Sequence, residues 1–177
     1  GVLETYCKET YDALKSQKDK MLADKPEALY PCETSVYSAI TINLNDPRVS
    51  FDILQRIDPA VWCILTAAGD YNPDLGGQLI LWDVGRVVRF PAGTCALIPA
   101  ALVRFSFVKV RPDERQHTIL QWAGVGIRRY FENGSREDGE FAMEASADEY
   151  RAREKKRRAM HADALRTFPL VKDVPEG

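Results

Sequence analysis

Histidine is nearly absent from this sequence, with two residues, His117 and His161, among 177. His117 lies in an apolar, strand-like segment, whereas His161 lies in a polar, helix-like segment near the C-terminus. A metal centre with two imidazole ligands would require both of them to converge on one carboxylate. Neither histidine lies in residues 1–116, so most of the chain offers no imidazole to a metal.

Clustered cysteine, long apolar runs and a charge excess are also lacking. The four cysteines are widely spaced without a C-x-x-C pair, which predicts neither a zinc site nor a dense disulfide framework. Reduced thiols are therefore expected, in an intracellular protein that is cytoplasmic or nuclear. No apolar run reaches about 18 residues, so we expect no membrane span. The net charge of -2 excludes a general attraction to nucleic acid or membranes.

The residues that are present predict a mainly β protein with flanking helices (α+β). An amphipathic helix is expected over residues 2–24, and a loop or an irregular edge over 45–60. Alternation of apolar residues and turn signals predict strands over 36–44, 61–68, 78–82, 86–90, 95–98, 102–108 and 118–123. Because no crossover helix fits between these strands, we expect a sandwich or barrel and exclude a parallel α/β fold.

The C-terminal region is helical and strongly charged. Ser146 and Glu149 match an S-x-x-E capping box, acids lead the segment, bases follow, and Pro169 is expected to end the helix. We therefore expect one domain over 1–177, with a helical segment at 1–29, a β core at 30–135 and a charged helix and tail at 136–177.

Two adjacent stretches carry a resemblance to a known family. They read GDYNPDLGGQLILWD at 69–83 and RVVRFPAGTCALIPAALVRFS at 86–106. Together with VWCI at 61–64 and QWAGVG at 121–126, they resemble fungal proteins related to the Tet/JBP branch of 2-oxoglutarate and iron(II) dioxygenases. The resemblance covers most of residues 30–168. It implies a double-stranded β-helix (a jelly-roll or cupin-like barrel), with iron(II) and 2-oxoglutarate as the cofactors of the family.

The same resemblance implies that the catalytic positions of this chain are degenerate. Asp52 stands where the family has its first histidine, Leu54 where it has the aspartate and Phe105 where it has the second histidine. Gln116 stands at the position of the arginine that binds 2-oxoglutarate. Leucine and phenylalanine offer no lone pair to a metal, so we predict no metal and no cofactor.

Five further residues are candidates for a pocket: Gln78, Asp83, Arg104, Arg115 and His117. Gln78 replaces a residue that is often histidine in the family. Asp83 has two interpretations, a catalytic carboxylate or a turn residue at a strand end, and the second is favoured. His117 is either a general base or, as we favour, a hydrogen-bonded strand histidine. Cys63 and Cys95 lie in apolar runs and are expected in the core.

Basic residues raise the possibility of nucleic-acid binding. The candidates are Arg86, Arg89, Lys155, Lys156, Arg157 and Arg158, and the strand region was also expected to hold Arg128 and Arg129. A basic tract on a helix is typical of nucleic-acid contact. It is equally typical of a solvated face that pairs with neighbouring acids.

Three functions follow from these observations. The leading prediction is a catalytically inactive dioxygenase-like domain that acts as a binding or scaffold protein, with the old pocket rebuilt around Leu54, Gln78 and Phe105. The first alternative is a divergent nucleobase-directed dioxygenase with substituted ligands. The second is a nucleic-acid-binding module that uses the arginines and the basic tail. The partner, protein or nucleic acid, and the oligomeric state remain open.

Overall fold

The computed structural model describes residues 1–45 and 51–166, apart from the side chains at positions 51, 52, 161, 163, 165 and 166. Two sequence candidates, Asp52 and His161, therefore lie outside the described side chains.

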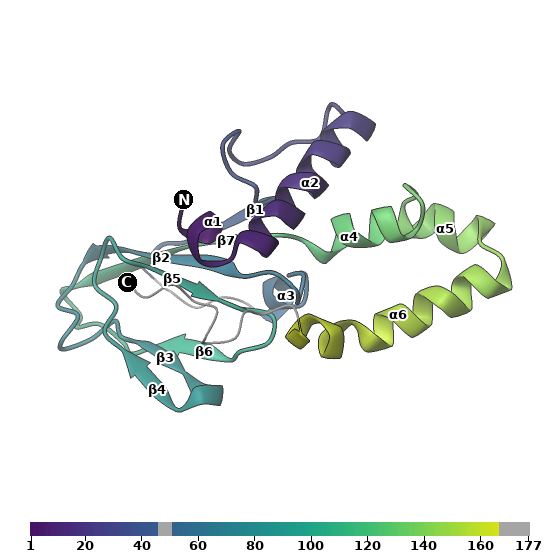
Figure 1. Ribbon diagram of the computed structural model, residues 1–177. Coiled ribbons are helices and arrows are strands. Elements are labelled where there is room, and N and C mark those ends of the chain that lie inside the picture. Colours follow the sequence, from purple (N-terminus) through teal and green to yellow (C-terminus); the bar gives the residue numbers. More distant parts are fainter. Residues whose placement is uncertain (46–50, 167–177) are drawn as a thin grey trace.

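The strands of the described chain form two antiparallel sheets (Figure 1). The first has the order β1 (Ala39–Asn43), β7 (Arg115–Trp122), β2 (Cys63–Asp70), β5 (Cys95–Ile98). The second has the order β4 (Arg86–Val88), β3 (Leu79–Leu81), β6 (Phe105–Phe107). The chain passes from the first sheet to the second and back twice. Antiparallel sheets with flanking helices confirm the predicted α+β class.

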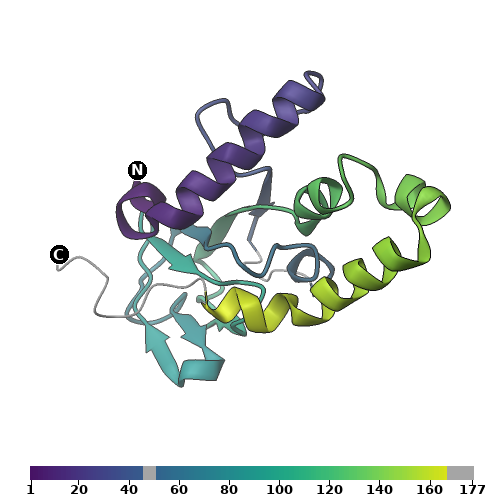
Figure 2. The same ribbon diagram turned by 45° about the vertical axis from the view of Figure 1, so that its right-hand side comes forward.

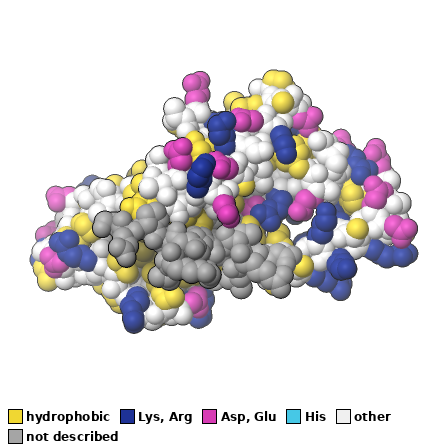
Figure 3. All heavy atoms as spheres, in the orientation of Figure 1, with side chains coloured by type: hydrophobic (Ala, Val, Ile, Leu, Met, Phe, Trp, Pro, Cys, Tyr) yellow, Lys and Arg dark blue, Asp and Glu magenta, His cyan; other side chains and the backbone are white. Residues whose placement is uncertain are grey.

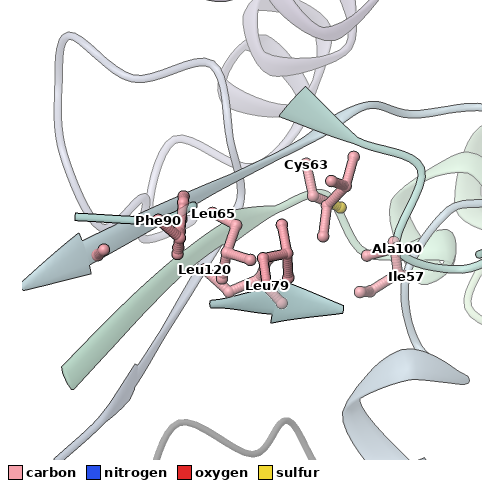
Figure 4. Packing of buried hydrophobic residues seen from close by; sticks show 9 residues of the cluster. Ile57, Cys63, Leu65, Leu79, Phe90, Ala100 and Leu120 are labelled. Atoms are coloured by element: carbon pink, nitrogen blue, oxygen red, sulfur yellow. The ribbon is translucent and has the colours of Figure 1, made fainter. Parts of the chain in front are cut away.

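The central ladder joins β2 to β7 and defines the core. Along β2, side chains alternate between a buried face and a partly exposed face, as a period of two requires. Leu65 lies opposite Leu120 in the register. Both are fully buried, and they pack with Leu79 of the second sheet in one apolar cluster (Figure 4). The core therefore lies between the two sheets.

Helices α1 (Val2–Tyr6) and α2 (Lys8–Asp24) are associated with a second apolar cluster, which includes Ile64 of β2 and Leu97 of β5. The sequence predicted one helix over 2–24, but the backbone breaks at Cys7, with φ -142° and ψ 56°. The break is accommodated because Leu3, Cys7 and Leu14 all enter the same cluster. The tertiary contact, rather than helical periodicity, decides the geometry there.

After β7 the chain forms an arm of three helices, α4 (Val125–Glu132), α5 (Asp138–Glu144) and α6 (Ala147–Arg166). The arm extends from the sheets and α6 runs back toward α3 (Phe51–Leu54) (Figure 2). The capping box that was predicted to open α6 is confirmed, since the Glu149 carboxylate accepts from the Ser146 backbone N–H at 2.8 Å. No helix in residues 1–45 or 51–166 combines the length and apolar character needed to cross a membrane.

Several sequence predictions of local structure were wrong. The region 45–60 is not entirely a loop, because it contains α3. Helices α4 and α5 were not predicted, since both are short and lie among glycines at 124, 126, 134 and 139. The strand expected over 102–108 is confined to β6, because the chain first turns at Pro99, whose carbonyl accepts from Leu102 and Val103. A 3-10 turn, η1 (Trp82–Val84), ends the strand predicted at 78–82.

The four cysteines are free thiols in two environments. Cys63 is buried in the core, where burial raises the pKa of its thiol to about 12. Cys95, expected in the core, is exposed instead, because it opens β5, the edge strand of its sheet. Cys32 is also exposed, and hydrogen bonds from Thr34 lower the pKa of its thiol.

We predict that iodoacetamide modifies Cys32 and Cys95 of the native protein quickly, while Cys7 and Cys63 stay protected until the chain unfolds. Exposure and thiolate fraction set the rate of alkylation. Intact and peptide mass spectrometry, with and without urea, measure the pattern. Rapid native labelling of Cys63 would contradict the described core.

Candidate functional site

Two of the four positions that the resemblance compares with catalytic residues pack against the same apolar cluster. Leu54, at the end of α3, and Phe105, at the start of β6, are both partly buried and contact the core formed by Leu65, Leu79 and Leu120. Phe105 meets Phe107 edge-on, with ring centroids 6.2 Å apart. Phe107 in turn lies 6.2 Å from Phe90. These positions therefore take part in hydrophobic packing.

The chemistry of these residues does not fit an iron centre. Neither Leu54 nor Phe105 has a donor atom, and a 2-His-1-carboxylate iron(II) centre requires imidazole nitrogens and a carboxylate. In the described part of the chain, no group of three His, Cys, Asp or Glu side chains is arranged to hold a metal ion. His117, the one histidine whose side chain is described, accepts a hydrogen bond at Nδ1 from the Asn45 backbone N–H at 3.0 Å.

Gln116, at the cosubstrate position, is buried on β7 and donates from Nε2 to the Gly77 carbonyl at 2.8 Å. Gly77 has φ +74°, and a Cβ there would collide with the Tyr71 ring and lie 3.1 Å from Gln116 Nε2. Glycine is therefore required at position 77 for the backbone to lie this close to Tyr71 and Gln116. Arg115 does not lie beside Gln116 on this face, because strand alternation leaves Arg115 exposed on the opposite face of β7.

Side-chain hydrogen bonds stabilise the turn that contains Gly77. Gln78 donates from Nε2 to the Pro73 carbonyl at 2.8 Å, so this pocket candidate serves the turn. Glu114 accepts from the Asn72 backbone N–H at 3.0 Å and from the Arg111 guanidinium at 2.6 Å. The bond from Arg111, followed by that from Asn72, lowers the pKa of Glu114 to about 2.

The lowered pKa of Glu114 predicts acid sensitivity. Because its folded pKa lies below the unfolded value of roughly 4.3, its contribution is present above that value and is lost as pH falls toward about 2. We expect Glu114→Gln to flatten the fall in unfolding free energy between about pH 4.5 and 2. Urea denaturation across this range, with Glu9→Gln on α2 as control, measures the difference. Parallel curves for the Glu114 variant and the parent would contradict the assignment.

Asp83 and Arg104 form one unit at the end of β3. Asp83 accepts from the Arg104 backbone N–H at 2.6 Å and from its side-chain Nη2 at 2.7 Å. The side-chain bond and then the backbone bond lower the pKa of Asp83. The Arg104 side chain is exposed. The pair connects η1, which holds Asp83, to the residue before β6. This geometry agrees with a turn aspartate.

The basic candidates do not form one patch. Arg89 is paired with Asp74 at 2.6 Å, and Arg86 bonds to the neighbouring Gly85 carbonyl at 3.4 Å. Lys155 and Arg158 are exposed on α6. By contrast, Lys156 and Arg157 face a cavity of about 370 Å³ between α4 and α6. Figure 3 shows Lys and Arg side chains gathered around the hollow between these helices.

The α4–α6 cavity brings together residues that no pattern in the sequence places side by side. It is lined by five cationic and two carboxylate residues: Arg128, Arg129, Arg153, Lys156, Arg157, Glu132 and Asp138. Arg128 and Arg129 were expected in the strand region but lie on α4. The Arg128-Arg129 pair, which follows an apolar strand, is a local sign of positive charge. Nothing in the sequence indicates that α6 lies beside this pair.

A buried ion pair positions α4. Arg128 Nε lies 2.7 Å from Asp58 Oδ2, and Asp58 is 1% exposed. Asp58 also accepts from the Ala60 backbone N–H, and its own N–H donates to the Ala123 carbonyl. Burial raises the pKa of Asp58, although Arg128 opposes the rise.

We predict that Arg128→Gln lowers the unfolding free energy at pH 7 by about 2–4 kcal/mol, because it leaves the Asp58 carboxylate buried without its partner. The raised folded pKa of Asp58 means that its ionisation opposes folding as pH rises through that pKa. The loss of unfolding free energy in Arg128→Gln should therefore be smaller at acidic pH, where Asp58 is protonated. Urea denaturation at pH 7 and pH 4 tests this, with Arg151→Gln on exposed α6 as control. A pH-independent or absent loss would contradict the role of the pair.

Comparison with known proteins gives little similarity. No protein-family model matches the chain, and no curated protein matches it. Among solved structures, NgTET1 in complex with 5mC DNA is similar, with a TM-score of 0.44 and 12% sequence identity. The similarity covers 63% of this chain and 47% of that chain, so this chain spans about half the length of that protein. A similarity at this level does not define a family.

Proposed function

We propose that the chain is a non-catalytic binding domain built on a dioxygenase-type double-stranded β-helix of the Tet/JBP kind. The carrying observation is that Leu54 and Phe105, two positions expected to hold metal ligands, pack against the hydrophobic core. When an apolar side chain packs at a ligand position, the fold of the enzyme is kept but the metal-binding atom is lost. Binding is then the function left to such a domain.

The strand order supports the choice of frame. The chain crosses four times between two antiparallel sheets, after β2, β4, β5 and β6, and the first sheet places the N-terminal strand β1 beside the C-terminal strand β7. Two facing sheets crossed in this manner are typical of jelly-roll barrels. The motifs at 69–83 and 86–106 supply β3, η1, β4 and β5 of this arrangement.

The cosubstrate position supports the same conclusion. A dicarboxylate such as 2-oxoglutarate is held well by the planar, charged fork of an arginine. Gln116 is neutral, and its amide donor is already used by the Gly77 carbonyl. Its Oε1 is buried without a hydrogen-bond partner in the described chain, and an acceptor there disfavours a carboxylate.

Direct titration tests the proposal. We expect isothermal titration calorimetry of the 177-residue chain with Mn²⁺, a stand-in for iron(II), to show no stoichiometric site, and 2-oxoglutarate to add none. One-to-one Mn²⁺ binding that tightens with 2-oxoglutarate would overturn the proposal and favour the divergent dioxygenase.

A substitution at Phe105 provides a second test. We expect Phe105→His to lower the unfolding free energy by about 1–3 kcal/mol through lost packing, and to gain no Mn²⁺ affinity. Tyr6→His on α1, where the tyrosine is exposed, is the control and should change stability by less than about 0.5 kcal/mol. An unchanged stability for Phe105→His, or a new Mn²⁺ site, would argue against a packing role.

A further inference from the structure

The cavity between α4 and α6 combines positive charge with buried donors that lack acceptors. Its lining carries five cationic residues and two carboxylates, and carboxylates outside the lining pair with two of the cations, Asp58 with Arg128 and Glu154 with Arg157. Arg129 and Arg153 share a single carboxylate, that of Asp138, at 3.2 Å and 3.8 Å. The Nε atoms of both arginines are buried, and neither has a hydrogen-bond partner among the described residues. Buried donors without acceptors are unfavourable, so the cavity is matched to an anion.

One acceptor accompanies these donors. Asn133, 1% exposed, lines the same cavity, and its Oδ1 is buried without a partner in the described chain. Its Nδ2 is already directed to Asp138 at 3.1 Å, which orients the amide. A ligand that satisfies the whole set therefore needs several acceptor oxygens and one donor.

We propose that this cavity binds a phosphomonoester group of a small ligand. A phosphomonoester carries up to two negative charges and, with a second pKa of about 6, retains a P–OH donor in part of its population near neutrality. Its oxygens accept from Arg129 and Arg153, while the P–OH donates to Asn133. A phosphodiester has acceptors alone and leaves the Asn133 oxygen unsatisfied.

The form of the cavity favours a small ligand over a nucleic-acid backbone. Its volume of about 370 Å³ lies within the range of roughly 300–1,000 Å³ that is typical of small-molecule sites. Lys156 and Arg157 lie at its rim, both exposed, and Lys156 forms no ion pair with another described residue. They supply charge to attract the ligand. The site lies mainly on the helical arm, and its lining also includes Gln55, the residue that follows Leu54 at the end of α3.

Calorimetry in 0.15 M NaCl at pH 7 tests the proposal with four probes: inorganic phosphate, adenosine 5′-monophosphate, adenosine and an oligonucleotide without terminal phosphates. We expect saturable binding of the two phosphomonoester-type probes and none of adenosine. Equal or tighter binding of the oligonucleotide would overturn the small-ligand assignment in favour of a backbone site. Flat titrations with phosphate and the monophosphate would show that water alone satisfies the arginines.

Matched charge reversals locate the site. We expect Arg157→Glu to weaken binding of the monophosphate at least about tenfold, since it places a carboxylate beside the bound anion. Arg151→Glu reverses the same charge on α6 outside the cavity, and should change the affinity less than about twofold because salt screens distant charges. Equal effects of the two substitutions would overturn the assignment.

A milder variant guards against misfolding. Lys156→Gln removes one rim charge from an exposed side chain, so its fold should remain intact by circular dichroism. We expect it to weaken the monophosphate several-fold, by the loss of one Coulombic contact. An unaltered affinity in this folded variant would exclude the cavity as the site.

Discussion

The antiparallel ladder between β2 and β7 is the constraint on which the rest of the structure depends. Each strand alternates its side chains, so the ladder has two faces. One face closes the core against β3 through Leu65 and Leu120, and Ile64 on the other belongs to the cluster of α1 and α2. A slip of one residue would exchange these faces and expose the core.

The same ladder also determines the environments of Leu54, Phe105 and Gln116, the residues that the resemblance compares with catalytic positions. Its inner face presents an apolar surface, and Leu54 and Phe105 pack on that surface from α3 and β6. The ladder also buries Gln116 and exposes Arg115, since neighbours on a strand face opposite ways. Packing and strand alternation together thus decide which of these residues are buried and which face the solvent.

The end of β7 also determines where the arm begins. Gly124 continues from β7 and forms a bridge with Ile57, and Val125 then opens α4. The buried pair of Asp58 and Arg128 holds the first turn of that helix against the segment before β2. The geometry of the cavity depends on how α4 is held, because α5 and α6 follow α4 in the chain and α6 runs back beside α4.

The class of the fold, β-strands with flanking helices, was predicted better than the limits of the individual helices and strands. Strand patterns found β5 at its observed limits and found the other strands to within a few residues, because alternation reports burial directly. Helix α4 was missed because Gly124 and Gly126 at its start weaken a local helical signal. The break at Cys7 was missed because it depends on a shared cluster with Leu14 and Tyr37.

What the sequence determined by itself is chemical composition at each position: two histidines, no donor atom at Leu54 or Phe105, and no positive charge at Gln116. Such properties belong to single residues and need no partner. The tertiary structure alone decided which residues meet. It packed Leu54 and Phe105 on one core, and it brought Arg128 and Arg129 to Arg153, 24 or more positions along the chain. Only the return of α6 toward α4 makes a cavity from these charges, and no local pattern encodes that return.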